Sequence, residues 1–366
     1  MCAPGRERLL ETFRELLRIS SPSGKEEALA RHLVAELEMM GLEVRRDGAG
    51  NVIARADGEG EPLLLCAHMD TVEPTEDLVI VEEDGCFRSD GTTILGADDK
   101  AGIATILEAI KRAGPRPPLD IVFTVHEEGG LLGAKALNLA ELRARRGLVL
   151  DAGGSVGSVV TAAPSQVKLA ARIHGVAAHA GSAPERGVNA IVLAARGITA
   201  MRLGRLDDET TANIGIIRGG QATNVVPDLV ELRGEARSHS EEKLQRQVAA
   251  MKGALEQAAT EGGGRAEVEV QRSYSGFSIP EDDPLVTTFL RVAERMGLEA
   301  ATVKGGGGSD ANVFNAQGMV CVNVSVGMGN SHAKDEYIRV DDLEQATGLL
   351  TELLRALSRL PERDSQ

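Results

Sequence analysis

Acidic and histidine side chains recur along this sequence directly after short apolar runs or glycine turns. Two adjacent glutamates, Glu127 and Glu128, follow the apolar run at residues 121–125 and precede a pair of glycines. Carboxylate oxygens and imidazole nitrogens are ligands for zinc and related divalent cations. An ordered series of such groups predicts a two-metal hydrolytic site. The other members of the series are His68, Asp70, Asp98, Asp99, Asp151 and His332.

The glutamate pair is the least easily explained without a metal. Two like charges beside a buried strand repel each other and lose hydration, and a nearby pair of cations would offset both costs. Because neighbouring side chains at a strand end face different directions, one glutamate could bind metal while the other contacts a water molecule. The alternative is that both are solvated turn residues before a helix.

His68 and Asp70 close an apolar run in the order His-Met-Asp. Residues two apart on a strand point the same way, so Asp70 could accept a hydrogen bond from one ring nitrogen of His68. That contact would leave the other nitrogen for a metal, as in carboxylate–histidine–metal arrangements. A purely structural pair is the alternative.

Asp98 and Asp99 lie in a turn at residues 96–102, just before an expected helix. One interpretation is an N-cap, a position that aspartate favours. The other is a ligand whose second oxygen bridges to a second metal. Asp151 follows an apolar run and His332 lies in a loop, and neither is informative by itself. Together, the ligand positions at strand ends and turns of one sheet favour a shared site.

The apolar runs predict the framework that positions these groups. Buried strands are expected at residues 63–67, 121–125 and 147–150, and a helix at residues 100–112. Strands that alternate with helices form a largely parallel sheet that helices cover on both faces. In such sheets ligands bind at the carboxyl ends of the strands. Three candidates follow the strands in this way: His68, Glu127 and Asp151.

The pattern changes near residues 163–165. Beyond this point the expected order is strand, helix, strand, strand, helix, strand, which is a split βαβ arrangement. From residue 283 onward α/β character resumes. The sequence therefore predicts an α/β catalytic domain formed by residues 1–164 and 277–366, with an α+β lid domain inserted at residues 165–276.

Composition excludes several functions. The chain of 366 residues has a net charge of −15, six Phe, two Tyr and no Trp, which argues against nucleic-acid binding through phosphate contacts or aromatic stacking. No apolar stretch reaches the ~18 residues of a membrane span, and the charged N-terminus is unlike a signal peptide. Four scattered cysteines without a Cys-x-x-Cys motif fit a reducing cytosol. We therefore expect a cytoplasmic protein that has neither nucleic acid nor membrane as a partner.

Four motifs occur in the order His68-Met-Asp-Thr, Gly96-Ala-Asp-Asp-Lys-Ala-Gly, His126-Glu-Glu-Gly-Gly and Ser331-His-Ala-Lys-Asp-Glu. With these motifs the sequence resembles the M20 family of co-catalytic metallopeptidases, and most closely its peptidase T-like (tripeptide aminopeptidase-like) branch. The resemblance extends over essentially the whole chain, including the inserted domain. It implies a mixed, largely parallel sheet covered by helices, of the zinc-exopeptidase-like kind, and a ferredoxin-like lid through which a homodimer forms.

The resemblance also implies a role for each candidate residue. Asp98 would bridge two metals, and a cis peptide bond would follow it. Glu127 would be the general base, and Asp70 would orient His68. One metal would be held by His68, Asp98 and Asp151, and the other by Asp98, Glu128 and His332.

Three residues of the lid could contact the substrate. By resemblance, His179 in the segment at residues 175–181 would donate a hydrogen bond to the oxyanion, often from the partner subunit. Asn224 and Arg237 would lie at positions that could contact the substrate. From the residues alone, a surface turn histidine is the preferred interpretation of His179, whereas a turn asparagine and a solvated strand-end arginine are equally good interpretations of Asn224 and Arg237.

The ligand set and the resemblance together predict the reaction. Imidazole and carboxylate ligands without a thiolate suit two divalent cations, Zn²⁺ first, with Mn²⁺ or Co²⁺ as alternatives. Aminopeptidase-like members of the family tend to have aspartate at the position of Asp151, whereas carboxypeptidase- and deacylase-like members tend to have glutamate. We therefore expect release of N-terminal residues from short peptides. The alternatives are an N-acyl-amino-acid deacylase or carboxypeptidase with the same metals, and a non-catalytic binding protein that retains the fold.

Overall fold

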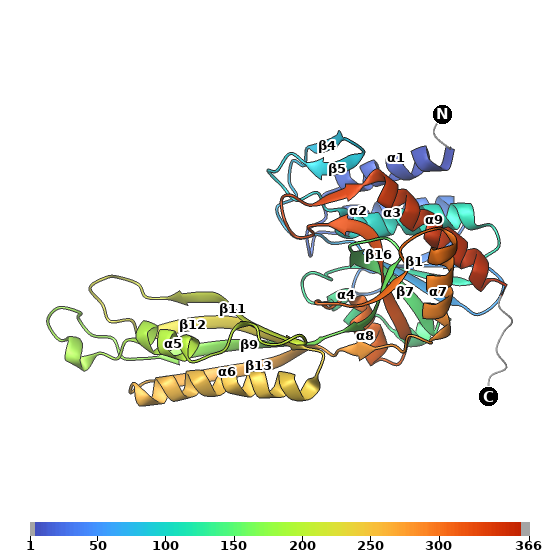
Figure 1. The fold of residues 1–366 in the computed structure, drawn as a ribbon. Coiled ribbons are helices and arrows are strands. Elements are labelled where there is room, and N and C mark those ends of the chain that lie inside the picture. Colours follow the sequence, from blue (N-terminus) through green and yellow to red (C-terminus); the bar gives the residue numbers. More distant parts are fainter. Residues whose placement is uncertain (1–3, 360–366) are drawn as a thin grey trace. The chain divides into compact units, whose positions relative to one another are not determined.

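The computed structural model describes residues 4–359, so Cys2 lies outside the described residues. The chain divides into two compact units, and unit 2 is an insertion in the sequence of unit 1 (Figure 1). Three glycines of the run at residues 305–308 group with unit 2. Unit 1 contains Met1–Ala162, Ser278–Gly305 and Ser309–Gln366, and unit 2 contains Ala163–Phe277 and Gly306–Gly308.

Unit 1 is built on a mixed sheet. Its main path runs β1 (Glu43–Arg46), β2 (Val52–Ala56), β6 (Leu119–Thr124), β3 (Leu63–His68), β7 (Arg146–Gly153), β16 (Val320–Gly329), β17 (Tyr337–Arg339), β5 (Cys86–Ser89) and β4 (Ile80–Glu83), and β8 (Ser158–Ala163), β14 (Phe277–Ser278) and β15 (Ala301–Lys304) pair beside it. The neighbours β6, β3, β7 and β16 are parallel to one another. Antiparallel strands flank this parallel centre on both sides. The predicted mixed, largely parallel sheet is therefore confirmed.

The register of the parallel strands brings two strand ends together. His68, the last residue of β3, pairs with Thr124, the last residue of β6. Strand β7 continues beyond the expected end at residue 150, because its pairing with β16 extends to Gly153. Asp151 consequently lies within β7 rather than after it.

Helices pack against this sheet. They are α1 (Pro4–Arg18), α2 (Glu27–Met39), α3 (Ala97–Ala113), α4 (Leu132–Ala136), α7 (Pro284–Arg295), α8 (Asp310–Ala316) and α9 (Val340–Leu357). Helix α3 packs on β3, β7 and β16, and α1 and α9 pack against α3. Gly102 allows the close approach to β7, because a Cβ at this position would lie 2.3 Å from the backbone oxygen of Leu150. The first turn of α3 is thus held beside the strands that carry the candidate ligands.

Unit 2 is an antiparallel sheet with helices α5 (Ala190–Thr199) and α6 (Glu241–Glu261) (Figure 1). Its strands, in spatial order, are β10 (Gly204–Arg205), β11 (Thr210–Gly219), β12 (Leu229–Ser238), β9 (Ser165–His174) and β13 (Arg265–Tyr274). Apart from the short β10, the chain order is βαββαβ, which confirms the ferredoxin-like lid. Alternate residues of β9 point into a core that they share with apolar residues of α5 and α6.

Two further properties bear on the sequence predictions. Within residues 4–359, no helix combines the length and apolar character that crossing a membrane requires. Cys66, Cys86 and Cys321 are buried free thiols.

Candidate metal centre

The side chain of His68 is buried at the carboxyl end of β3, and a backbone contact defines its tautomer. Its Nδ1 lies 2.7 Å from the carbonyl oxygen of Asp70, which can only accept a hydrogen bond, so Nδ1 carries the proton of the neutral ring. The carboxylate of Asp70, which the sequence suggested as this acceptor, is farther away at 3.6 Å. The Nε2 atom of His68 is therefore left to bind a metal.

Asp98 lies between two imidazoles. Its Oδ1 is 3.0 Å from Nε2 of His68, and its Oδ2 is 3.3 Å from Nε2 of His332. Burial opposes ionisation, but the contacts with His332 and His68 hold the pKa of Asp98 below its usual value. The peptide bond between Asp98 and Asp99 is cis, as the family resemblance implied. Each carboxylate oxygen of Asp98 thus faces a different histidine, as a bridging ligand requires.

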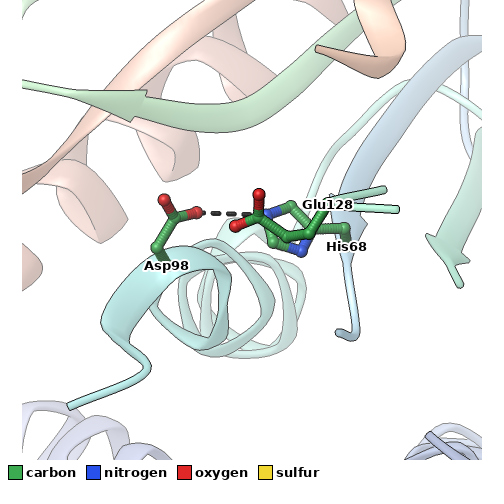
Figure 2. A group of neighbouring side chains, drawn as sticks. All are labelled: His68, Asp98 and Glu128. Atoms are coloured by element: carbon green, nitrogen blue, oxygen red, sulfur yellow. Dashed lines mark hydrogen bonds and ion pairs between the residues drawn. The ribbon is translucent and has the colours of Figure 1, made fainter. Parts of the chain in front are cut away.

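Glu128 and His332 extend the cluster on the Oδ2 side of Asp98. Glu128 Oε1 lies 2.7 Å from Nε2 of the half-exposed His332. Figure 2 shows His68, Asp98 and Glu128 converging, and these three residues offer ligand atoms within 4.8 Å of one another. Hydrogen bonds to Asp98 and Glu128 raise the pKa of His332 to about 10. The acids around His332 therefore favour a positive charge at this position.

Asp151 lies near Nε2 of His68, with its Oδ1 at 3.6 Å. Burial, to which repulsion from Asp98 adds, raises the pKa of Asp151 to about 7 although His68 opposes the shift. Asp99 forms a second compact group with His68 and Asp151. The Asp99 oxygens, however, already accept the backbone N–H groups of His68 at 3.2 Å and Gly102 at 3.1 Å. Asp98 therefore has the carboxylate that is better placed to bind metal.

Glu127 is buried beside this cluster. Burial and repulsion from Asp151 raise the pKa of its carboxyl group. The carboxylate of Asp70 accepts the backbone N–H groups of Glu127 at 2.8 Å and Glu128 at 3.1 Å. Asp70 therefore contacts His68 through its carbonyl oxygen and the glutamate turn through its carboxylate.

Two residues of the loop before α2, Ser23 and Glu26, contact the same region and were not among the predicted site residues. The hydroxyl of Ser23 donates to Oδ2 of Asp70 at 2.6 Å. Glu26 accepts the backbone N–H of His126 at 3.1 Å, although the two residues are 100 positions apart. The polar composition of this loop is visible in the sequence, but no spacing rule connects it to a turn so far along the chain.

The residues present fit divalent metal ions. Burial and repulsion between neighbouring carboxylates raise the pKa values of Glu127 and Asp151, and hydrogen bonds to Asp98 and Glu128 raise the pKa of His332. A divalent cation would offset the negative charge that gathers here. Oxygen and imidazole nitrogen donors suit Zn²⁺, Mn²⁺ and Co²⁺. Short contacts join the five residues predicted as ligands: His68 and His332 lie beside Asp98, Asp151 lies beside His68, and Glu128 lies beside His332.

The predicted lid residues lie in unit 2. His179 is exposed, and its Nδ1 accepts the backbone N–H groups of Gly181 and Ser182, both at 3.1 Å. The proton of the neutral ring is therefore on Nε2. Asn224 lies close to His179, because the backbone carbonyl oxygen of Asn224 accepts the backbone N–H of Ala180 at 2.9 Å.

Arg237 is separated from these two residues. Strand β12 begins at Leu229, a few residues after Asn224, and Arg237 is eight residues farther along the strand. A strand rises ~3.3 Å per residue, so Leu229 and Arg237 are about 26 Å apart. The guanidinium of Arg237 donates to Glu235 from Nε at 2.8 Å and from Nη2 at 3.2 Å. The lid thus places His179 and Asn224 together and Arg237 at a distance.

Comparisons with known proteins agree with this site. A family model described as Peptidase family M20/M25/M40 matches residues 64–356. Protein YqjE of Bacillus subtilis is 40% identical, with 96% of this chain and 99% of the relative covered. The crystal structure of aminopeptidase PepT from Bacillus cereus has a TM-score of 0.86 and a sequence identity of 42%. The crystal structure of a tripeptidase from Staphylococcus aureus has a TM-score of 0.91 and a sequence identity of 39%. Each alignment covers 97% of this chain and 99% of the other. The chain therefore belongs to peptidase family M20/M25/M40, in its peptidase T-like branch, and is a metal-dependent peptide hydrolase.

Proposed function

We propose that the protein is a two-metal aminopeptidase that removes N-terminal residues from short peptides such as tripeptides. The observation that carries this proposal is the position of Asp98, whose two carboxylate oxygens lie 3.0 Å and 3.3 Å from the imidazoles of His68 and His332. Asp151 joins His68 on one side, and Glu128 joins His332 on the other. His68, Asp98 and Asp151 would hold one cation. Asp98, Glu128 and His332 would hold the other, so that Asp98 belongs to both groups.

Zn²⁺ is the proposed metal, with Mn²⁺ and Co²⁺ as alternatives. Mixed imidazole and carboxylate donors are typical of hydrolytic zinc sites. Cations bound here would supply Lewis acidity toward the scissile carbonyl group and lower the pKa of water.

Glu127 is the proposed general base. Its neighbour Glu128 is a proposed ligand, and Asp70 holds the backbone N–H groups of both. Because burial raises the pKa of Glu127, its carboxylate takes up a proton more readily than an exposed glutamate does. It would accept the proton of the attacking water and return it to the departing amine.

His179 is the proposed donor to the developing oxyanion. Two backbone N–H groups engage its Nδ1, so its Nε2 presents an N–H on an exposed ring. A donor of this kind, aimed at the carbonyl oxygen of the substrate, would stabilise the negative charge that forms there.

We propose a homodimer in which His179 and Asn224 serve the active site of the partner subunit. About 26 Å of β12 lies between Arg237 and the end of the lid that carries these two residues. An extended tripeptide spans about 10 Å. Arg237 and His179 of one subunit therefore cannot both contact one tripeptide, so a shared site would need a residue from each subunit.

The proposed substrate is a short peptide with a free amino group. Asp151 is the residue that the aminopeptidase-like members of the family tend to have at this position. The relatives from Bacillus cereus and Staphylococcus aureus, described as an aminopeptidase and a tripeptidase, support this choice at 42% and 39% identity.

A cytoplasmic location, without nucleic acid or membrane as a partner, is part of the proposal. Buried free thiols at Cys66, Cys86 and Cys321 fit a reducing compartment. A net charge of −15 disfavours phosphate backbones and anionic lipid surfaces.

Tripeptides with free and acetylated amino termini test the proposal. The protein would be treated with a chelator, reconstituted with Zn²⁺, Mn²⁺ or Co²⁺, and assayed by mass spectrometry of the products. We expect the chelated protein to be inactive, and the reconstituted protein to release the first residue of free tripeptides while leaving acetylated ones intact. Release of the C-terminal residue would favour a carboxypeptidase, and release of the acyl group from N-acyl amino acids would favour a deacylase. Full activity after exhaustive chelation would contradict the metal site.

A further inference from the structure

Glu336 is a fully buried carboxylate that the mechanism above does not use. It lies directly before β17, at the end of the loop that carries His332. Its Oε2 accepts the backbone N–H of Gly96 at 2.7 Å, and its Oε1 accepts that of Asp98 at 2.9 Å. One side chain therefore binds the backbone on both sides of Ala97.

The backbone at this position needs such a partner. Gly96 has a positive φ of 75°, and Asp98 departs from helical angles with φ −78° and ψ 104°. N–H groups at the start of a helix have no carbonyl partner within the helix, and leaving them buried and unpaired is costly. Because both oxygens of a carboxylate accept hydrogen bonds, Glu336 can satisfy two of these groups at once.

The loop of Glu336 is itself anchored. The backbone N–H of Glu336 donates to the carbonyl oxygen of Ala333 at 3.0 Å. The hydroxyl of Ser89, which donates to the carbonyl oxygen of Thr93 at 2.6 Å, also lies 3.2 Å from the carbonyl oxygen of Lys334. His332 therefore lies in the same short loop as the side chain that holds the backbone of Asp98. The two candidate ligands lie close together, with Oδ2 of Asp98 3.3 Å from Nε2 of His332.

We propose that Glu336 is a positioning residue that couples the His332 loop to the backbone of Asp98, so that both side chains can hold the same cation. This inference rests on the proposed two-metal function. A glutamine at this position would retain one acceptor oxygen, but its NH₂ group would face a backbone N–H, so one of the two amides would lose its partner. Asp98 would then shift relative to His332.

Asp120 offers a matched control in the same unit. It is also fully buried, and its carboxylate accepts the backbone N–H groups of Arg143 at 2.5 Å and Ala144 at 2.8 Å. It lies near the amino end of β6, whereas the candidate ligands gather at the carboxyl ends of the strands. Both amides bind Oδ2, and Oδ1 faces Nε of Arg143 at 3.3 Å, so Asp120→Asn disturbs a buried carboxylate that supports backbone amides without touching the backbone of a ligand.

The test compares the wild type, Glu336→Gln and Asp120→Asn. Bound Zn²⁺ is counted by elemental analysis after dialysis, and Zn²⁺ affinity is measured by competition with a chromophoric chelator. Both measurements are made at a temperature at which circular dichroism shows that each variant is folded. We expect Glu336→Gln to bind Zn²⁺ about tenfold or more weakly, as is typical when support behind a metal ligand is removed. Asp120→Asn should lower the melting temperature while Zn²⁺ affinity stays within about threefold of the wild type, because distant sites act independently.

Unchanged Zn²⁺ affinity in Glu336→Gln would overturn the inference and leave the proposed function standing. If wild-type protein failed to bind two Zn²⁺ ions, the proposed function itself would be wrong. Should Glu336→Gln not fold, Glu336→Asp replaces it, because it keeps the charge but is too short to reach both amides. We expect weakened Zn²⁺ binding for this variant as well, and wild-type affinity would again overturn the inference.

Discussion

The carboxylate of Asp70 accepts the backbone N–H of Glu127 at 2.8 Å, although Glu127 comes 57 residues later in the chain. The same carboxylate binds the N–H of Glu128 at 3.1 Å and the hydroxyl of Ser23 at 2.6 Å. Its backbone carbonyl oxygen binds His68. Asp70 therefore links a proposed ligand, the proposed base and the loop before α2 in one buried arrangement.

Asp70→Asn should lower kcat about 10- to 100-fold with a smaller change in KM, the range seen when groups behind metal ligands are replaced. The amide has one acceptor oxygen, so its NH₂ group would face a backbone N–H of the glutamate turn and displace Glu127. Steady-state kinetics on a free tripeptide measures both constants. Ser23→Ala, which removes one hydrogen bond from Asp70, should give a smaller loss in kcat. A larger loss for Ser23→Ala than for Asp70→Asn would contradict this order.

Glu127→Gln should reduce turnover about 10²- to 10⁴-fold, the usual contribution of a general base, and leave the metal content unchanged. The amide keeps the size of the side chain but cannot accept the proton of water. Single-turnover assays on metal-replete protein, together with elemental analysis, measure the two effects. Glu128→Gln is the matched comparison and should lose bound metal as well as activity. Retained peptidase activity in metal-replete Glu127→Gln would remove this residue as the base.

Asp310 should make the stability of the chelated protein depend on pH. Burial raises its pKa to about 6 although the hydroxyl of Thr124 donates to its Oδ2 at 2.6 Å. Its Oδ1 is buried without a hydrogen-bond partner among the described residues. Because the folded pKa exceeds the unfolded value of about 3.9, the protonated form stabilises the fold at low pH, and this contribution is lost as the pH rises through 6.

Asp310→Asn removes this loss, since the amide carries no charge. The stability of the variant relative to the wild type should therefore be greater at pH 8 than at pH 5, by about 1.4 kcal/mol in the free energy of unfolding. The difference is only part of the full effect, because the unfolded carboxyl group is already ionised at pH 5. Urea unfolding of both chelated proteins at the two pH values gives the comparison. Asp335→Asn, at an exposed position, serves as the control and should show no such trend. An advantage of Asp310→Asn that is equal at both pH values would contradict the prediction.

Mixing two inactive variants should restore activity if His179 acts in the partner's site. In a mixed dimer, the His179→Ala subunit supplies Glu127, and the Glu127→Gln subunit supplies His179 to the same site. Random exchange makes half of the dimers mixed, each with one complete site, so about a quarter of the wild-type activity should return. The readout is tripeptide hydrolysis after subunit exchange, with each variant alone as the control. No recovery in a mixture shown to have exchanged would mean that His179 acts within its own subunit.

The order of motifs along the chain was enough to predict the α/β sheet with its inserted α+β lid, and to name five candidate ligands that the fold brings close together. This is possible because buried parallel strands are nearly continuous apolar runs, and a polar residue just after such a run comes to the ligand-binding edge of the sheet. His68 follows this rule. Asp151 departs from it slightly, because pairing with β16 extends β7 past its apolar part.

The supporting contacts were decided only by the tertiary structure. Ser23 on Asp70, Glu26 on the N–H of His126 and Glu336 on the N–H of Asp98 join segments that are 47, 100 and 238 residues apart. The acceptor atom of Asp70 that binds His68 also depended on folding, since it proved to be the backbone oxygen rather than the carboxylate. Side-chain type and spacing indicate which groups can bind a metal. Which backbone amides remain unpaired, and which distant carboxylate reaches them, follows from how the loops pack.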